Sequence, residues 1–320
     1  METIRGKMEK RAFTKISLGT FFTGLFWAAT FLLVRAMSTR FPKMAEGSQI
    51  IELLISLATY GVAILIMWLF LRGMPVLKGV PKQRMSFLSF LGYACSMRGV
   101  AMILSLVGIV VFLLVALAVK GPEDLMKSLF ESNPFFPESP MSMATDLILI
   151  CIAAPLFEEL MFRRLLLDVL RPFGDTVAVI YSGIAFGLLH MNFQQFFYAA
   201  GLGLMLGYVM VRTNNIWYCI GLHAVFNSMS VLFLPLLNNL DMENVDIMSL
   251  SALWIMLGVI LMISVIGIVL FIVNVKKIRL EKPRFRFSIP IGFKLVFLNA
   301  GTIPYALVCL LMAVHQIYII

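Results

Sequence analysis

The sequence predicts an all-α protein, a polytopic transmembrane helix bundle of about eight or nine spans. Hydrophobic residues make up 61% of the 320 residues and charged residues only 13%, whereas soluble domains usually carry about 25% charged residues. The mean hydropathy is +0.95. A soluble domain could not bury this much apolar surface, so we expect residues 1–320 to form a single membrane-embedded domain.

Nine apolar runs are the predicted spans, because about 20 apolar residues suffice to cross a bilayer. They are residues 16–37, 50–71, 98–119, 144–170, 177–191, 194–211, 216–236, 248–274 and 294–318. The fifth and sixth runs are the shortest, and a different fold of residues 177–211 would leave eight spans. Basic residues precede the first run, as in a signal peptide. That run is long, however, and Arg35 follows it, which favours a retained span.

The charges between the runs predict the orientation of the chain. Lys and Arg gather in the N-terminal arm and in the connections 72–98, 163–175 and 275–294. Acidic residues occupy the alternate connections, with Glu123, Asp124, Glu131 and Glu138 in one and Asp241, Glu243 and Asp246 in the other. The positive-inside rule therefore predicts a cytoplasmic N-terminus in a cell membrane. Topology and contact with anionic lipids explain the net charge of +9, so we expect no nucleic-acid partner.

The four cysteines lie far apart, in or beside apolar runs. They are Cys95, Cys151, Cys219 and Cys309, and none forms a C-x-x-C pair. We therefore expect them to be small packing residues and not disulfide partners or metal ligands.

The fourth run contains two adjacent carboxylates, Glu158 and Glu159, although a charged residue inside a span costs about 2.5–3.5 kcal/mol on insertion scales. Glu159 and Arg163 are spaced i, i+4 with the acid on the N-terminal side, the favoured order for a helical ion pair. Glu158 is rotated from Glu159 by about 100°. We therefore expect Arg163 to neutralise Glu159, and Glu158 to face the bundle interior.

The chain has three histidines. His190 ends an apolar run, and His223 shares a helix face with Asn227 at spacing i, i+4. At a rise of about 1.5 Å per residue, Glu158 and these three groups lie roughly 10–20 Å from the predicted cytoplasmic ends of their spans. We therefore expect the four groups to meet in one layer of the membrane. His315, whose polar neighbour is the adjacent Gln316, is expected to be structural.

These residue types suit the hydrolysis of an amide bond. A carboxylate in an apolar bundle can act as a general base for water, and a histidine can relay the proton or hold the water. A second histidine and an asparagine amide can donate hydrogen bonds to an oxyanion. No Ser or Cys nucleophile is then required. The alternative is structural, with a buried ion pair at Glu159 and interhelical hydrogen bonds from His223 and Asn227.

Three motifs in this region resemble those of a known family. Glu158-Glu159-x-x-x-Arg163, Phe186-x-x-x-His190 and His223-x-x-x-Asn227 are similar, in order and separation, to the signatures of the CPBP family (CAAX proteases and bacteriocin-processing enzymes). This family is also called Abi and includes the type II CAAX prenyl endopeptidases. The resemblance covers about residues 145–230, the expected catalytic core, and leaves 1–120 and 240–320 as flanking transmembrane helices. One departure is Arg164, where the family often has glycine.

The resemblance implies roles for the motif residues. Glu158 and His190 would activate water, His223 and Asn227 would form the oxyanion site, and the ion pair of Glu159 would support them. The family is often described as metalloproteases, and Glu158, His190 and His223 are candidate Zn²⁺ ligands with an open position. The helical zinc motif H-E-x-x-H is absent from the sequence, so activation of water without a metal is favoured.

The predicted function is therefore that of an intramembrane endopeptidase. Its substrates would be membrane-associated peptides or lipidated proteins, in CAAX-type processing or in pheromone or bacteriocin maturation, with the lipid bilayer as a further partner. One alternative is a non-catalytic membrane scaffold or immunity protein that binds a peptide or a sensor partner. Another is a small-molecule or proton-coupled transporter, although the sequence has no evident two-fold repeat or paired broken helices.

Overall fold

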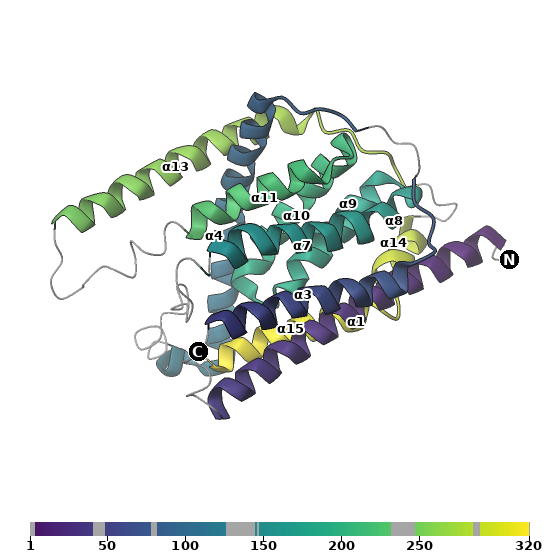
Figure 1. The fold of residues 1–320 in the computed structure, drawn as a ribbon, viewed down its shortest axis with the longest axis horizontal. Coiled ribbons are helices and arrows are strands. Elements are labelled where there is room, and N and C mark those ends of the chain that lie inside the picture. Colours follow the sequence, from purple (N-terminus) through teal and green to yellow (C-terminus); the bar gives the residue numbers. More distant parts are fainter. Residues whose placement is uncertain are drawn as a thin grey trace.

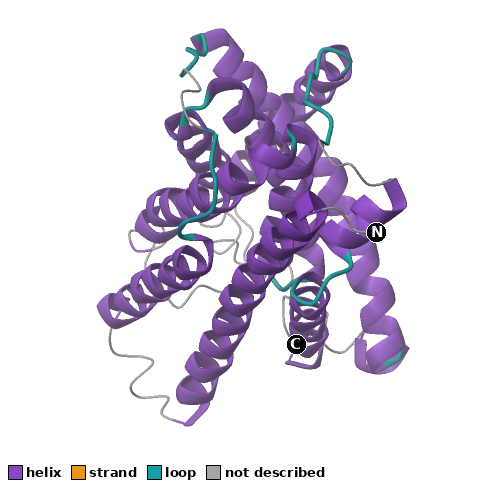
Figure 2. Cartoon of the chain, turned by 90° about the vertical axis from the view of Figure 1, so that its right-hand side faces the viewer, coloured by secondary structure: helices purple, strands orange, loops and turns teal. Residues whose placement is uncertain are grey.

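The computed structural model describes residues 4–40, 49–77, 82–125, 145, 147–231, 247–283 and 289–319. Every regular element within these ranges is a helix, as the sequence predicts (Figure 1). Figure 2 gives the same view turned by a quarter and shows no strand in the described part of the chain. Several acidic residues that support the predicted orientation lie outside the described residues, namely Glu131, Glu138, Asp241, Glu243 and Asp246.

Three long helices form the first part of the bundle: α1 (Ile4–Arg40), α3 (Gln49–Leu71) and α4 (Phe87–Lys120). α1 and α4 begin earlier than the predicted spans 16–37 and 98–119. The basic arm continues as helix because Lys and Arg are good helix formers. The Ser86 hydroxyl caps α4 by accepting a hydrogen bond from the Ser89 N–H at 3.2 Å. Arg98, expected in a connection, therefore lies well inside α4.

Residues 147–170 of the fourth predicted span, 144–170, form one helical segment whose winding changes. A π-helix, η1 (Leu147–Ala153), leads into α7 (Ala154–Glu159), and a second π-helix, η2 (Leu160–Leu167), leads into α8 (Asp168–Leu170) and the 3-10 turn η3 (Arg171–Phe173). Pro155 stands in the first turn of α7, where it removes one backbone donor as the winding changes. Wide π turns are frequent at functional sites, and the two adjacent carboxylates lie between two of them.

The next three helices are α9 (Asp175–Leu189), α10 (Phe193–Thr213) and α11 (Ile216–Val231). α9 and α10 are separate helices, so the runs 177–191 and 194–211 are two elements, as predicted. Asn192 fixes the break between them, because its side-chain oxygen accepts hydrogen bonds from the N–H groups of Gln194 and Gln195. This is an N-cap for α10.

α9 and α10 pack closely through small residues. A Cβ atom added at Gly187 would lie 2.8 Å from the Phe196 carbonyl oxygen and 2.9 Å from the Ala200 nitrogen, and one at Gly203 would lie 2.9 Å from the Gly183 Cα. Gly183 and Gly187 have the small-xxx-small spacing that lets transmembrane helices approach each other. This contact fixes the end of α9, where the histidine of the second motif lies.

The C-terminal helices are α13 (Ile247–Val275), α14 (Ile289–Phe297) and α15 (Thr302–Ile319). The predicted span 294–318 is not one continuous helix, because α14 and α15 are bent by 53° at the break between them. The Asn299 side chain accepts hydrogen bonds from the N–H groups of Gly301 and Thr302 at 3.0 and 2.9 Å and so caps α15. α13 packs on α4 and projects from the rest of the molecule (Figure 1).

Five helices in the described part of the chain are long and apolar enough to cross a membrane. They are Gly6–Met37, Leu53–Leu71, Phe87–Lys120, Phe193–Thr213 and Ser251–Val275, and the bent pair α14–α15 makes a sixth if it is one span. α9 and α11 are shorter apolar helices. Outward-facing side chains such as Leu114 and Trp254 are 62% and 64% exposed, which suits contact with lipid. The chain is therefore a polytopic membrane protein, as predicted.

The buried centre of the bundle lies between η2, α9 and α10, with α1 and α15 along one side. Its fully buried side chains include Phe13, Met161, Phe162, Leu166, Phe186, Leu206 and Tyr305. The guanidinium-bearing Arg163 is buried among them with 0% exposure. A cation this deep in an apolar core requires an anionic partner. That partner is Glu159, one of the predicted site residues.

Candidate active site

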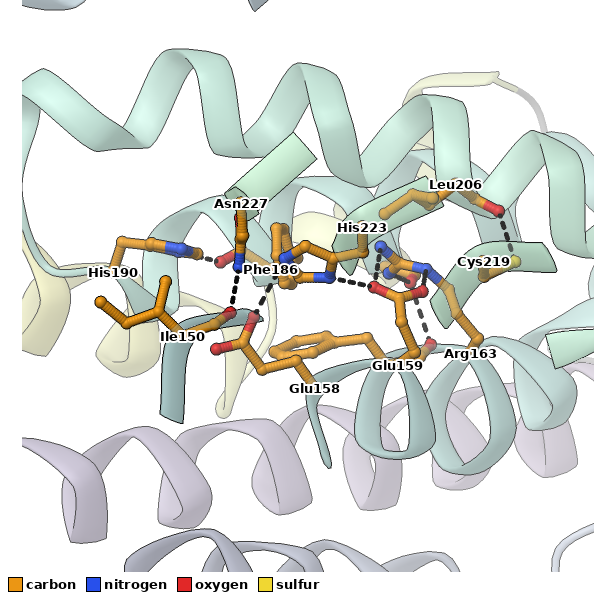
Figure 3. Close-up of polar contacts among 12 residues, drawn as sticks. Ile150, Glu158, Glu159, Arg163, Phe186, His190, Leu206, Cys219, His223 and Asn227 are labelled. Carbon is orange, nitrogen blue, oxygen red and sulfur yellow. Dashed lines mark hydrogen bonds and ion pairs between the residues drawn. The ribbon is translucent and has the colours of Figure 1, made fainter. Parts of the chain in front are cut away.

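The predicted site residues come from three parts of the chain (Figure 3). Glu158 and Glu159 end α7, Arg163 lies in η2, His190 directly follows α9, and His223 and Asn227 lie on α11. The first and third motifs touch directly, and the ring of Phe186 in the second motif lies against His223, with ring centroids 5.7 Å apart. The structure therefore gathers the three motifs around one point of the bundle.

Glu159 and Arg163 form a buried ion pair, as predicted from their spacing. Arg163 Nε lies 2.9 Å from Glu159 Oε2, and both side chains have 0% exposure. Arg163 Nη1 also donates to the Ser182 hydroxyl at 3.1 Å, and the guanidinium lies 5.2 Å from the Phe186 ring centroid. Ser182 in turn donates to the Phe162 carbonyl at 3.1 Å. These contacts stabilise the charge of Arg163 in an apolar core.

His223 connects the two carboxylates. Its Nδ1 lies 3.0 Å from Glu159 Oε1, and its Nε2 lies 3.8 Å from Glu158 Oε2. The ring is 3% exposed. Because a carboxylate is an acceptor, the Glu159 contact places the ring proton on Nδ1. Glu159 therefore orients the imidazole so that Nε2 faces Glu158, in the way that a buried carboxylate orients a catalytic histidine.

Glu158 faces the interior without an arginine partner, as predicted. Its side chain is 13% exposed, and its Oε1 accepts a hydrogen bond from the Tyr60 hydroxyl at 2.8 Å. Tyr60 lies on α3, where its ring stacks on Phe157 at 5.5 Å and packs edge-on against Trp27 at 5.0 Å. These contacts fix one carboxylate oxygen and leave Oε2 directed toward His223.

His190 lies in the turn that ends α9. Its Nδ1 is 3.0 Å from the Phe186 carbonyl oxygen, and its ring packs edge-on against Phe186 with centroids 5.0 Å apart. Glu158 and His223 both lie within electrostatic reach of the imidazole. The Nδ1 contact to a carbonyl makes that nitrogen the donor, so Nε2 is the nitrogen available to a water or a substrate.

Asn227 joins α11 to the π-helix that precedes the carboxylates. Its Nδ2 donates a hydrogen bond to the Ile150 carbonyl in η1 at 2.8 Å. This hydrogen bond links α11 to η1, the π-helix that leads into the two carboxylates. In Figure 3, Asn227 and His190 lie on the same side of Glu158.

The three candidate zinc ligands are Glu158, His190 and His223. No group of three or more His, Cys, Asp and Glu side chains among the described residues is arranged to hold a metal ion. The Nδ1 atoms of both histidines are engaged by the Phe186 carbonyl and by Glu159. These contacts leave Nε2 of each ring available, as in zinc-binding histidines, so a zinc role for the three side chains stays a prediction.

The remaining polar and thiol candidates lie apart from this cluster or act as packing residues. His315 is exposed on α15. All four cysteines are free, and the buried Cys219 donates to the Leu206 carbonyl, which joins α11 to α10. Arg164, at the position of the family departure, pairs with Asp168 at 3.2 Å on the partly exposed side of the segment.

Sequence reasoning missed two residues of the site. Tyr60 stands 98 positions before Glu158, in a predicted span with no family motif, and Ser182 lies inside an apolar run of α9. Ser182 could have been anticipated, because the buried guanidinium of Arg163 needs several hydrogen-bond acceptors. Tyr60 could not have been anticipated, because tyrosines are common in membrane helices.

Comparison with known proteins places this cluster in a family. The segment 140–229 matches a family model described as type II CAAX prenyl endopeptidase Rce1-like. No curated protein and no solved structure matches the chain. The matched segment contains every motif residue from Glu158 to Asn227, which confirms the resemblance seen in the motifs. Residues 140–229 therefore resemble the type II CAAX prenyl endopeptidase family.

Proposed function

We propose that this protein is an intramembrane endopeptidase that hydrolyses a peptide bond with water activated by Glu158 and His190. The observation that carries the proposal is the position of Glu158. It lies in the interior without an arginine partner, with its Oε2 3.8 Å from His223 Nε2, inside the segment that matches a CAAX endopeptidase family. The neighbouring Glu159 forms the ion pair with Arg163, so the two carboxylates have different roles.

In the proposed reaction Glu158 acts as the general base. It accepts a proton from a water molecule as the water oxygen attacks the carbonyl carbon of the scissile bond. His190 holds this water through Nε2, because its Nδ1 is engaged by the Phe186 carbonyl. The tetrahedral intermediate then collapses, the C–N bond breaks, and Glu158 returns the proton to the leaving amine. Water is consumed and no covalent enzyme intermediate forms.

His223 and Asn227 stabilise the oxyanion in this mechanism. His223 would donate Nε2–H when its ring carries a second proton, while Glu159 accepts from Nδ1. The Asn227 amide has two N–H donors, of which one is used by the Ile150 carbonyl and the other is left for the oxyanion. Preorganised donors of this kind are worth about 10²–10³ in rate each.

The substrate is a lipidated protein or another membrane-associated peptide. The same chain contains five helices that are long and apolar enough to cross a membrane, so a peptide held at the membrane is the natural substrate. A lipid anchor would hold the peptide there. The charge distribution along the chain supports a cytoplasmic N-terminus.

Peptide termini in three otherwise identical host strains test this proposal. One strain carries the wild-type protein, one carries Glu158→Gln at matched abundance, and one carries a deletion. We expect new termini in membranes and medium only with the wild type. If Glu158→Gln instead matches the wild type and only the deletion changes the phenotype, the protease proposal is wrong and a scaffold role takes its place.

A further inference from the structure

The turn between α9 and α10 holds His190 next to a strained residue. Met191, which follows His190, has a φ of 51° and is 5% exposed. This left-handed conformation is unfavourable for a residue with a long side chain. Asn214 is the other non-glycine residue with positive φ in the described ranges, and asparagine adopts this conformation readily. Strain of this kind persists only where the surrounding structure holds the chain, so other contacts must hold the turn.

Asn192 makes the first of these contacts, and its hydrogen bonds fix which way its amide points. Its Oδ1 accepts hydrogen bonds from the N–H groups of Gln194 and Gln195 at 2.8 and 3.3 Å. Only the oxygen of an amide can accept from a backbone N–H, so the NH2 group must face the other side. There Nδ2 donates to the side-chain oxygen Oε1 of Gln316 at 3.0 Å. The partner of Asn192 therefore has to be an acceptor, and α15 supplies it.

The helix that carries Gln316 is anchored on both elements that the turn joins. Near the start of α15, the Tyr305 hydroxyl donates to the Ala185 carbonyl of α9 at 2.7 Å, and this hydrogen bond is buried. Near the end of α15, Ile317 is 1% exposed and belongs to a small apolar cluster against which Phe193, the first residue of α10, packs. Gln316 therefore reaches Asn192 from a helix that is fixed relative to α9 and α10.

The turn decides where the imidazole of His190 points. Its Nδ1 lies 3.0 Å from the Phe186 carbonyl oxygen, which leaves Nε2 for a water or a substrate. The backbone at this point has only the last hydrogen bonds of α9, such as that from the Met191 N–H to the Leu188 carbonyl at 3.0 Å. Release of the strain at Met191 would therefore move the neighbouring imidazole relative to Glu158.

We propose that Gln316 is a positioning residue for His190, because it accepts the Asn192 hydrogen bond that holds the strained turn in place. This inference rests on the proposed endopeptidase function, in which His190 holds the attacking water. It gives a role in the reaction to α15, which lies outside the segment 140–229 that matches the endopeptidase family. Because Gln316 acts through the turn, its loss lowers kcat and leaves KM unchanged.

The test measures cleavage of a synthetic farnesylated peptide by the purified full-length protein in phosphatidylcholine nanodiscs. Gln316→Met removes the acceptor and keeps the length of the side chain, whereas Gln316→Glu keeps an acceptor oxygen. His315→Leu is the matched control, because His315 is the adjacent residue on α15 and is exposed. Since a displaced catalytic group can cost about 100-fold in rate, we expect Gln316→Met to lower kcat by about tenfold to 100-fold. Gln316→Glu and His315→Leu should keep the wild-type kcat.

Asn192→Ser is a second variant that removes the same contact from the other side. Serine keeps the N-cap of α10 but has no amide to donate to Gln316. We expect Asn192→Ser to lower kcat as Gln316→Met does, and the double variant to be no slower than either single variant, since two residues that act through one contact are not additive. Additive losses would show that Gln316 acts elsewhere and would remove the assignment.

Nuclear magnetic resonance of the imidazole rings gives a readout that does not depend on proteolysis. The chain has three histidines, so protein with isotope-labelled histidine gives few signals, and His190→Gln assigns that of His190. The contact with the Phe186 carbonyl predicts a proton on Nδ1, and the partner of a ring nitrogen decides the tautomer. We expect Gln316→Met to add a second population protonated on Nε2, and Gln316→Glu to show the wild-type signal.

Several outcomes would overturn the assignment. Gln316→Met could keep the wild-type kcat or leave the His190 signal unchanged, and a loss of kcat shared by Gln316→Glu and His315→Leu would show a merely structural effect. If Gln316→Met does not fold, Asn192→Ser carries the same test. If the wild type cleaves no farnesylated peptide, the protease proposal fails and the resonance decides alone: a second His190 tautomer in Gln316→Met keeps the positioning contact, and an unchanged spectrum rejects it.

Discussion

Arg163 is the residue whose loss should destabilise the bundle most, because it and Glu159 have 0% exposure. Arg163→Gln leaves a buried carboxylate without its cation, for which the expected loss of unfolding free energy is about 3–5 kcal/mol. Thermal unfolding in detergent measures this loss. Arg164→Gln is the matched control on the same segment, since its pair with Asp168 is 30% and 19% exposed and should contribute less than about 1 kcal/mol. Equal melting temperatures for the two variants would contradict a structural role for the buried pair.

Tyr60 should tune the reactivity of Glu158 without holding the fold together. Tyr60→Phe removes the 2.8 Å hydrogen bond to Glu158 and keeps the ring that stacks on Phe157. Hydrogen bonds to charged groups are worth about 1.5–3 kcal/mol, so we expect kcat to change by about tenfold or more with the melting temperature nearly unchanged. Tyr93→Phe, at a ring that lies against Tyr208 on the α4–α10 contact, should change neither. An unaltered kcat for Tyr60→Phe would show that the bond has no catalytic role.

At the residue scale, the spacing of residues along one helix predicted the contacts that form within that helix. The i, i+4 relation of Glu159 to Arg163 identified the ion pair and assigned Glu158 to the interior. The contact between His223 and Glu159 depends on how α11 meets α7, and the Tyr60 hydrogen bond depends on α3. The spacing of residues along one helix cannot predict such contacts between helices.

At the scale of helices, the α9–α10 contact should be intolerant of larger side chains. Gly187→Ala would bring a Cβ to 2.8 Å from the Phe196 carbonyl oxygen, so the helices must separate and the turn with His190 must shift. We expect lower thermal stability and lower activity together. Gly61→Ala on α3 is the control, because nothing lies within 4 Å of its added Cβ and alanine is the better helix former by roughly 0.5–1 kcal/mol. A Gly187→Ala protein as stable and active as the control would exclude this role for the contact.

Helix ends were the least predictable elements, for physical reasons that differ between them. α4 starts earlier than its apolar run because Ser86 caps it, and hydropathy does not detect caps. The bend between α14 and α15 comes from hydrogen bonds to the Asn299 side chain within a run that is apolar on both sides. Hydropathy indicates which residues can face lipid. The bend does not change the apolar surface, so hydropathy does not predict it.

At the scale of the whole molecule, composition and the order of three motifs were sufficient to predict a helical membrane protein and its family. Of the four groups expected at one depth, His190 and His223 lie against the Phe186 ring, and Glu158 lies 3.8 Å from His223. Their shared depth in the membrane stays a prediction. The position of Arg98 inside α4 could not be foreseen, because it follows from the unexpected start of that helix at Phe87. Its contact with the Phe226 ring depends on how α4 and α11 pack together.

The central claim is that Glu158 activates water for peptide hydrolysis inside the membrane. The most direct measurement is the rate at which purified protein in nanodiscs cleaves a farnesylated peptide, followed by mass spectrometry of both products. We compare the wild type with Glu158→Gln, and use Glu123→Gln, at an exposed carboxylate, as control. The wild type and the control should cleave at the same rate, and Glu158→Gln should be slower by at least about 100-fold at equal thermal stability. Cleavage by Glu158→Gln at the wild-type rate would contradict the claim.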